Sequence, residues 1–409
     1  MTDDSPADES STGAANGAAA DSGEDVPGVD PATLQRRIDA GDPVRVLDLR
    51  NRDEVEQWHL AGPNVSLTQQ PYNRFVRARV TDGIDEFVAA VAGEGPITVV
   101  CARGEASAEV AAGLLERGHD AHNLTGGMDA WARLLLATEV DGAVGGDDDA
   151  LVQYRRPSSG CLGYLVASAG AAAVVDPLRA FTGRYVADAR ERGVEVETVV
   201  DTHVHADHVS GLRSLAKATG ATPVMPERAV ERGVTGDVTT VGDGDTLDVG
   251  DLAVEAVHAP GHTTGMTAVA VGDALLTGDS LFLDGVARPD LEAGFETAEA
   301  FARELYRTVT DRFSPFPGET VVAPGHHGEG AQPDADGVFA APLDECRQSR
   351  VFEMGEDEFV AHVTDRRPSR PANHERIVAV NLGRESVDDE AAFELELGPN
   401  NCAAAPADD

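Results

Sequence analysis

The chain has 409 residues, which is enough for two or three domains with cores of their own. Acidic residues outnumber basic ones by 72 to 32, so the formal net charge is −40 at pH 7. A chain this acidic lacks the clustered Lys and Arg that bind phosphate groups, which argues against nucleic acid and anionic membrane surfaces as partners.

The composition also bears on where the protein works. Lys217 is its single lysine, and an acid excess with almost no lysine is typical of proteins from salt-loving organisms. Molar salt shortens the Debye length to roughly 3 Å and so screens the self-repulsion of such a charge. The 4 cysteines contain no CxxC pair, which favours a reducing, cytoplasmic location. Neither a signal peptide nor a membrane-spanning run of roughly 20 apolar residues is expected.

The chain divides into two folded blocks with acidic segments around them. Residues 1–28 are predicted to be a disordered tail, because so polar a stretch buries too little surface to offset the entropy of ordering. Residues 29–138 are the first folded block, and residues 151–384 are the second block with a C-terminal extension. The Gly- and Asp-rich residues 139–150 predict a linker between the blocks. Residues 385–409 are expected to be a second acidic tail.

The first block alternates helix and strand patterns, which predicts an α/β domain with a parallel sheet. Helices are expected over Pro31–Ala40, Asp85–Ala92, Ser107–Arg117 and Met128–Leu136. Strands are expected over Val44–Leu49, Ile97–Val100 and Ala121–Leu124.

A cysteine lies in a loop where a reactive thiol is chemically favoured. The strand Ile97–Val100 runs directly into Cys101, and Ser107 opens the next helix. Backbone N–H groups of such a loop converge on an anion, so the thiol is expected to ionise and to carry a sulfur atom. Gly104 allows the tight turn, and Arg103 adds positive charge for the sulfur donor. On spacing alone, a buried structural cysteine is an equal alternative.

Several motifs of this block resemble the rhodanese family. Residues 101–107 match CxxGxxS and residues 124–131 match LxGGxxAW. The sequences VLDLR at 46–50 and HLAG at 59–62 resemble two further family elements. The resemblance implies a rhodanese-like α/β domain in which Cys101 is the catalytic, persulfide-carrying nucleophile. We assign Arg103 and Gly104 of the same loop to substrate binding.

The second block contains more strands and predicts two sheets with flanking helices. Strands are expected over Tyr164–Ser168, Ala171–Val175, Glu197–Val200, Ala253–Val257, Thr267–Val271, Ala274–Leu276 and Thr320–Val322. Helices are expected over Tyr185–Arg192, Thr297–Val309 and Asp357–Asp365.

Histidines and aspartates gather where strands of this block end. The candidate metal ligands are His203, His205, Asp207, His208, His262, Asp279 and His326. The first four follow the strand Glu197–Val200 in the run HVHADH, and each of the others follows an apolar strand on a turn that contains Gly. Imidazole and carboxylate suit Zn, Fe or Mn. So dense a pattern favours a metal centre over a set of unrelated surface histidines.

The HxHxDH run followed by His, Asp and His resembles the metallo-β-lactamase superfamily. The resemblance covers most of residues 151–343 and implies an αββα sandwich with the metal site at one edge of the sheets. In the glyoxalase II (hydroxyacylglutathione hydrolase) type, two zinc ions would share Asp279, and bound hydroxide would attack a thioester. In persulfide dioxygenases, one Fe(II) would bind His203, His262 and Asp279, with open positions for a thiolate-type substrate and O₂.

The motifs favour the dioxygenase type. Residues 202–211, THVHADHVSG, and residues 261–265, GHTTG, resemble that subfamily, and Arg288 in ARPD resembles its GRxD element and is assigned to the substrate. A fused rhodanese-like domain suits an enzyme that oxidises persulfide sulfur. We therefore expect a sulfur-metabolism enzyme that oxidises a low-molecular-weight thiol persulfide with O₂ to sulfite. The alternative is a dinuclear zinc thioester hydrolase, and an oligomer is compatible with either.

Overall fold

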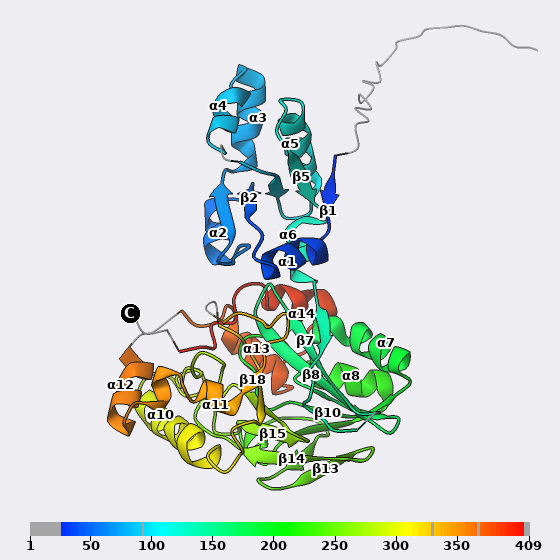
Figure 1. Ribbon diagram of the computed structural model, residues 1–409, viewed down its shortest axis with the longest axis vertical. Coiled ribbons are helices and arrows are strands. Elements are labelled where there is room, and N and C mark those ends of the chain that lie inside the picture. Colours follow the sequence, from blue (N-terminus) through cyan, green and yellow to red (C-terminus); the bar gives the residue numbers. More distant parts are fainter. Residues whose placement is uncertain (1–25, 92–93, 147, 329–330, 366–368, 405–409) are drawn as a thin grey trace, which may run out of the picture.

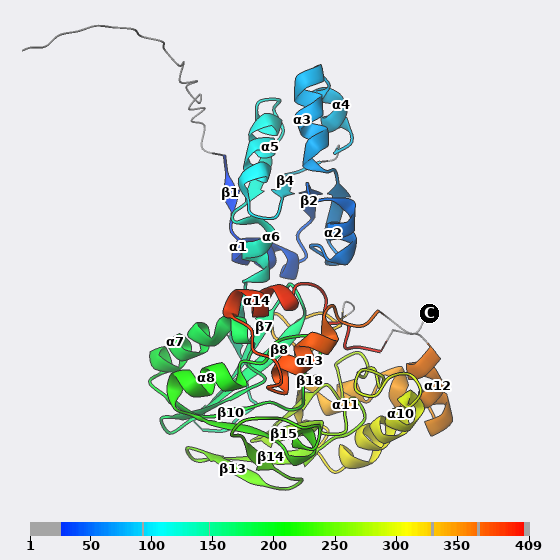
Figure 2. The ribbon, with the colours of Figure 1, turned by 180° about the vertical axis from the view of Figure 1, so that it is seen from behind.

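The computed structural model describes residues 26–91, 94–146, 148–328, 331–365 and 369–404. The described chain forms two α/β domains, and the smaller, N-terminal one stands on one end of the larger one (Figures 1 and 2). Helices α1 (Pro31–Asp39) and α6 (Gly127–Ala132) of the small domain face helix α14 (Asp389–Leu395) of the large domain at this junction.

A five-stranded parallel sheet lies at the centre of the N-terminal domain, as the alternating pattern predicts. In spatial order its strands are β1 (Gly28–Val29), β5 (Ala121–Leu124), β4 (Ile97–Val100), β2 (Val44–Asp48) and β3 (Val65–Gln69). The other helices are α2 (Arg52–Gln57), α3 (Tyr72–Thr81), α4 (Ile84–Ala89) and α5 (Glu105–Leu115). Neighbouring residues of β2 enter separate cores, Val46 with α1 and α6, and Leu47 with α3 and α5. Both faces of the sheet are therefore covered.

The boundaries of this domain differ from the predicted ones. Gly28 pairs with Asn123 in the sheet, so the chain from residue 26 onward belongs to the domain and not to the predicted tail. The expected tail over residues 1–25 and the expected helix end at residue 92 lie outside the described residues. Helix α6 ends at Ala132, and Leu136, the predicted end of the helix, begins a strand instead. The run of leucines at this point suits a helix or a strand, so its pattern does not distinguish the two.

Two sheets form the C-terminal domain. The strands of the first are β12 (Thr239–Val241), β11 (Thr222–Pro226), β10 (Glu195–Val200), β9 (Ala171–Val175), β8 (Cys161–Ser168), β7 (Ala150–Arg156) and β6 (Leu136–Glu139). The strands of the second are β13 (Thr246–Val249), β14 (Leu252–His258), β15 (Thr267–Val271), β16 (Ala274–Gly278), β17 (Val321–Pro324) and β18 (Ala341–Pro342). The helices before α14 are α7 (Thr182–Arg192), α8 (Leu212–Thr219), α9 (Glu227–Val230), α10 (Ala298–Arg307), α11 (Leu343–Cys346), α12 (Glu356–Asp365) and α13 (His374–Asn381).

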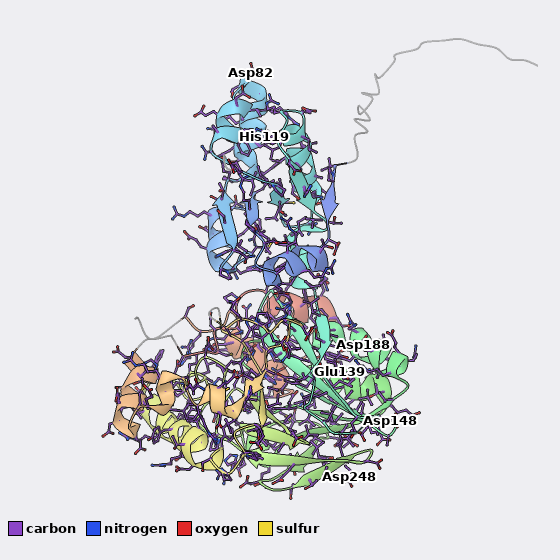
Figure 3. All side chains as sticks on the ribbon, in the orientation of Figure 1. Asp82, His119, Glu139, Asp148, Asp188 and Asp248 are labelled. Carbon is purple, nitrogen blue, oxygen red and sulfur yellow. The ribbon has the colours of Figure 1, made fainter. Side chains whose placement is uncertain are left out.

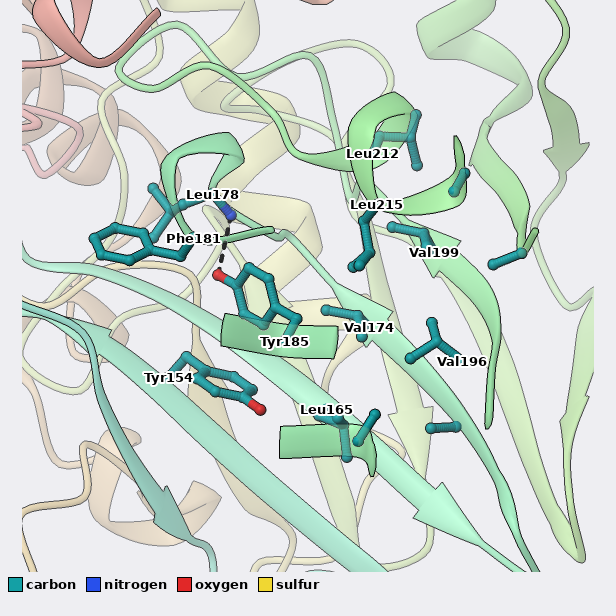
Figure 4. Packing of buried hydrophobic residues seen from close by; sticks show 14 of the residues in the cluster. Tyr154, Leu165, Val174, Leu178, Phe181, Tyr185, Val196, Val199, Leu212 and Leu215 are labelled. Atoms are coloured by element: carbon teal, nitrogen blue, oxygen red, sulfur yellow. Dashed lines mark hydrogen bonds between the residues drawn. The ribbon is translucent and has the colours of Figure 1, made fainter. Parts of the chain in front are cut away.

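The sheets and helices stack as four layers. Successive residues of β9 point to opposite faces, so Ala173 enters the core between the two sheets and Val174 enters the core under α7 and α8. In that outer core, the ring of Tyr185 meets the ring of Tyr154 edge-on at 4.7 Å, and its hydroxyl accepts the backbone N–H of Leu178 (Figure 4). Helices α10 and α12 pack on the outer face of the second sheet. The predicted αββα sandwich is confirmed.

The predicted linker over residues 139–150 is wrong for the part that the structure describes. β6 and β7 pair as antiparallel strands, and the chain between them turns back within the C-terminal domain. Val140 and Ala143 are buried in the core between the sheets, and the Ala143 carbonyl accepts the N–H of Asp273. Gly and Asp are favoured in hairpin turns as much as in linkers, so composition does not separate the two.

The predicted C-terminal tail is also wrong as far as residue 404. Asp388 caps helix α14 through its side chain, which accepts the N–H of Ala391, and the apolar face of the helix packs on Val209 and Ile377. Cys402 is buried further along the same segment. The acidic residues of α14 lie on its exposed face, so the net charge of a segment does not show that it is loose. Residues 405–409 lie outside the described chain.

Acidic side chains are spread over the surface of both domains. Asp82 lies at the far end of the small domain and Asp248 at the opposite end of the molecule, and both are exposed (Figure 3). None of the helices in the described ranges has the length and apolarity required to cross a membrane.

Candidate metal centre

The candidate ligands all follow strands of the two packed sheets. β10 leads into Asp201 and the run from His203 to His208, while β16 leads into Asp279 and β17 into His326. His262 follows β14 on a turn whose Gly261 has φ 135° and no space for a side chain. All of these histidines and aspartates are buried in the structure. The sandwich therefore brings separate strand ends to one edge, as the sequence pattern predicts.

A first ligand group consists of His203, His262 and Asp279, whose ligand atoms lie within 4.8 Å of one another. The Asp279 Oδ2 is 3.8 Å from His203 Nε2 and 3.6 Å from His262 Nε2. Within the described ranges, His203 Nε2 and Asp279 Oδ2 are buried and have no hydrogen-bond partner. Buried polar atoms rarely stay unsatisfied, so this donor set fits a metal ion.

The other ring nitrogen of each of these histidines is held by the protein. His203 Nδ1 lies 2.9 Å from the Thr202 hydroxyl, and His262 Nδ1 lies 2.9 Å from the Arg288 carbonyl, to which it donates. Burial lowers the pKa of both His203 and His262, which keeps the rings neutral and able to bind a metal. Burial alone would raise the pKa of Asp279, but the neighbouring His326 keeps it below its ordinary value.

A second group is centred on Asp207 Oδ2. This oxygen lies 2.8 Å from His326 Nε2 and 3.1 Å from His208 Nδ1, and it accepts the Cys161 thiol at 3.3 Å. The ligand atoms of the four residues lie within 4.8 Å of one another. His326 Nδ1 is 2.6 Å from Asp279 Oδ1, so the two groups are adjacent.

Charges within the second group favour protonated imidazoles. Burial alone would lower the pKa of His208 and of His326, but the carboxylates beside them raise it well above its ordinary value. For His208 the carboxylate is Asp207, and for His326 both Asp279 and Asp207 act. The same pairing holds the pKa of Asp207 well below its ordinary value although burial would raise it.

His205 belongs to neither ligand group, because its ring nitrogen pairs with a different carboxylate. Its Nε2 is 3.0 Å from Asp176 Oδ1, and among the described residues its ligand atom groups with Asp176 and Asp201. Asp176 also accepts the N–H of Thr202 at 2.7 Å. The His205 ring still lies next to the His203 ring, with centroids 4.1 Å apart. The structure thus places His205 beside the centre, with its buried Nδ1 unpartnered within the described chain.

Two cysteines near the centre are absent from the predicted ligand set. Cys161 belongs to the Asp207 group, and Cys402 lies with Asp279 and His326 in a third set of close ligand atoms. Burial raises the pKa of the Cys402 thiol. Neither residue stands in a motif, and both come from segments far from the ligands in sequence, so no pattern could have marked them.

Arg288 does not reach outward to a substrate. Its buried guanidinium forms two hydrogen bonds to the Asp290 carboxylate, at 2.7 and 2.9 Å, and a third to the Ser369 carbonyl. Its own carbonyl accepts His262 Nδ1. The assignment to substrate binding is therefore corrected, because every side-chain nitrogen is used inside the protein and the residue orients a candidate ligand instead.

In the loop predicted to carry sulfur, one backbone N–H and one hydroxyl group point at the Cys101 thiol. Cys101 follows β4, and its Sγ accepts the Gly104 N–H at 3.1 Å and the Ser107 hydroxyl at 3.2 Å. Gly104 has φ 98°, and a Cβ there would lie 2.9 Å from Gly126 N, so the turn requires glycine. Arg103 is turned outward, with its side chain 77% exposed and 3.7 Å from the Asp129 carboxylate.

Comparison with known proteins shows the families to which the two domains belong. Residues 159–326 match the family model of the Metallo-beta-lactamase superfamily, and residues 30–134 match that of the Rhodanese-like domain. The mouse mitochondrial persulfide dioxygenase ETHE1 is 30% identical over 187 residues, which are 44% of this chain and 69% of that protein. The chain belongs to the metallo-beta-lactamase superfamily.

Further relatives of this superfamily member fall into both subfamilies that the motifs suggested. A hydroxyacylglutathione hydrolase of Cereibacter sphaeroides is 33% identical over 217 residues, covering 53% of this chain and 78% of that protein. The crystal structure of ETHE1 from Myxococcus xanthus superimposes with a TM-score of 0.51 and 27% identity, over 57% of this chain and 99% of that one. The protein therefore combines a rhodanese domain with a metallo-β-lactamase domain, as its motifs predict.

Proposed function

We propose that this protein is a sulfur-metabolism enzyme that binds one Fe(II) per chain and oxidises a low-molecular-weight thiol persulfide with O₂. One persulfide, one O₂ and one water would yield the thiol, sulfite and two protons, so the outer sulfur is oxidised and O₂ is reduced. The proposal is supported by the similarity to persulfide dioxygenases and by the fused rhodanese domain. The cysteines are free thiols, which supports a cytoplasmic site of action.

The proposal depends most on which candidate ligand atoms lack a hydrogen-bond partner. In the first group, His203 Nε2 and Asp279 Oδ2 are unpartnered among the described residues and face each other. In the second group, His326 Nε2 is directed at Asp207 Oδ2, so these two atoms already satisfy each other. Two histidines and one carboxylate are the ligand set of non-haem Fe(II) oxygenases, which leaves positions open for the substrate and O₂.

The residues around the proposed iron hold its ligands in place. Thr202 and the Arg288 carbonyl fix the ring orientations of the two histidines, so each Nε2 faces the centre. His326 holds Asp279 Oδ1 and leaves Oδ2 for the metal. When bound, Fe(II) would supply a place where the persulfide and O₂ meet. Burial of all these groups keeps bulk water away from the reacting sulfur.

We assign sulfur carriage to Cys101. Its thiolate would attack the outer sulfur of a donor persulfide, release the donor thiolate and hold the sulfur as a cysteine persulfide. The Gly104 N–H and the Ser107 hydroxyl both donate to Sγ, which stabilises negative charge there. We also propose a domain boundary near residue 135, because β6 already belongs to the larger sheet.

The alternative function is a dinuclear zinc thioester hydrolase. It is favoured by two atoms of the second group, His208 Nε2 and Asp207 Oδ1, which also lack a hydrogen-bond partner within the described chain. Asp279 lies between the two groups and could serve both ions. The 33% identical hydroxyacylglutathione hydrolase supports the same assignment.

Metal analysis and oxygen uptake separate the two functions. The protein is purified anaerobically with iron in molar salt, and glutathione persulfide is added under an oxygen electrode. The dioxygenase requires about one iron per chain, one O₂ consumed per sulfite formed, and loss of both iron and uptake in His262→Ala. His119→Ala, in the small domain (Figure 3), is the matched control. Two zinc ions per chain, with cleavage of a glutathione thioester and no O₂ uptake, would refute the dioxygenase.

A further inference from the structure

A buried ion pair joins the two domains between their candidate sites. Arg156, at the end of β7, donates from Nε to the Ala132 carbonyl at the end of α6, over 2.9 Å. Its Nη1 lies 2.9 Å from Glu396 Oε1, and both side chains are 1% exposed. The other Glu396 oxygen, Oε2, accepts the N–H of Val209 at 3.0 Å. Val209 directly follows His208, so the pair connects helix α6 to the loop that carries candidate ligands.

The opposite end of α6 holds the Cys101 loop. The N–H groups of Met128 and Asp129, in the first turn of α6, donate to the carbonyls of Cys101 and Ala102, each over 2.9 Å. The two segments also touch without space between them, because a Cβ on Gly127 would lie 2.4 Å from the Cys101 oxygen. A shift of α6 must therefore move the loop around Cys101.

The chemistry of the pair makes its two members move together. A charged group buried without a partner is strongly disfavoured, so Arg156 and Glu396 stay in contact when either segment shifts. The rings of Phe181 and Phe393 both lie 5.5 Å from the Arg156 guanidinium and restrict its motion further. An exposed pair at the same junction, Arg133 with Glu390, has side chains 46% and 70% exposed, so water weakens the attraction between its charges.

We infer that Arg156 and Glu396 are positioning residues that couple the Cys101 loop to the metal-ligand loop. Binding of a divalent metal in the large domain alters the packing of α6 through this pair and thereby the surroundings of Cys101. By linkage, a group attached to Cys101 changes the affinity of the metal site by the same coupling. The inference rests on the proposed function only in taking these two loops as the sulfur-carrying and metal-binding sites.

The two tryptophans provide a reporter. Trp131 lies in α6 and Trp58 elsewhere in the small domain, so neither belongs to the domain that holds the ligands. In a Trp58→Phe background, metal-free protein in molar salt is titrated with Zn²⁺, which does not itself quench fluorescence. Zinc bound per chain is measured by equilibrium dialysis, and Trp131 emission is recorded in parallel.

The expected result is a change in Trp131 emission that saturates with zinc binding. The double variant Arg156→Met with Glu396→Gln removes both charges, so it leaves no uncompensated charge, and it should bind zinc without the emission change. Arg156→Lys keeps the charge but loses the Nε donor, so it should also bind zinc without the change in Trp131 emission. This variant serves as the test if the double variant does not fold. Arg133→Met is the matched control and should retain it.

A second measurement tests the reverse direction. Alkylation of Cys101 with iodoacetamide should shift the zinc dissociation constant at least threefold in the Trp58→Phe protein and not in the double variant. Zinc binding with no change in emission would overturn the coupling but leave the proposed function standing. An equal response in the double variant and in Arg133→Met would overturn the role of the pair. Failure of the unaltered protein to bind zinc would refute the metal site itself.

Discussion

Replacing Arg288 tests whether the C-terminal domain depends on a buried ion pair beside its candidate metal ligand. Arg288 contacts Asp290 through two hydrogen bonds, and their side chains are 1% and 7% exposed. Removing one partner of such a pair is typically destabilising by about 3–5 kcal/mol, because the other charge stays buried. Arg370 lies 3.8 Å from the same carboxylate and compensates in part. We therefore expect Arg288→Met to lose about 3 kcal/mol, at the lower end of that range.

The loss is measured by urea and thermal unfolding of the metal-free protein in molar salt. For a domain of this size, about 3 kcal/mol corresponds to a melting temperature lower by about 6–12 °C. Arg303→Met removes an exposed ion pair with Asp357 and is the control for loss of an arginine. The double variant Arg288→Met with Asp290→Asn should recover most of the stability, because no charge is left alone. An Arg288→Met protein as stable as Arg303→Met, or a double variant less stable than the single one, would refute the reasoning.

Three further predictions concern the proposed carrier cysteine, alkaline pH and salt. Cys101→Ser should abolish sulfur transfer to a thiol while iron content stays that of the unaltered protein; transfer that persists would remove Cys101 from the reaction. Burial raises the pKa of Cys346 to about 11 from an ordinary value of 9.0, so the unfolded thiol ionises first. The contribution of the buried Cys346 thiol to the stability of the folded protein is complete below pH 9 and is lost as the pH rises to about 11. Two pKa units at roughly 1.4 kcal/mol each amount to about 3 kcal/mol. Unfolding of Cys346→Ala should show a flatter profile in this range, and identical profiles would contradict the assignment. With a net charge of −40, the melting temperature should rise from low to molar salt as self-repulsion is screened, and a constant melting temperature would exclude this.

The comparison of sequence with structure shows where local patterns suffice. The loop of Cys101 and the HVHADH run each lie within a few residues of a strand end, so their surroundings depend on backbone that the motif itself encodes. The same is true of Asp279 and His326, which follow β16 and β17. For these residues, the predicted convergence at one sheet edge is what the structure shows.

Composition was a poorer guide to order. The acidic, Gly-rich residues 139–150 were predicted to be a linker and the acidic C-terminus a tail, yet Ala143 and Cys402 are buried in the large domain. Whether such a segment packs depends on the few apolar side chains that meet a partner surface, and that surface is formed by strands distant in sequence.

The sequence by itself determined the two domain families, the candidate metal ligands and the position of the proposed carrier cysteine, because each is encoded by short motifs at strand ends. Only the tertiary structure decided how the ligands divide into groups, that His205 turns to Asp176, and that Cys161 joins Asp207. It also decided the contact of Arg156 with both domains. These contacts join residues far apart in the chain, and their geometry is set by how the sheets and domains pack, which no local pattern specifies.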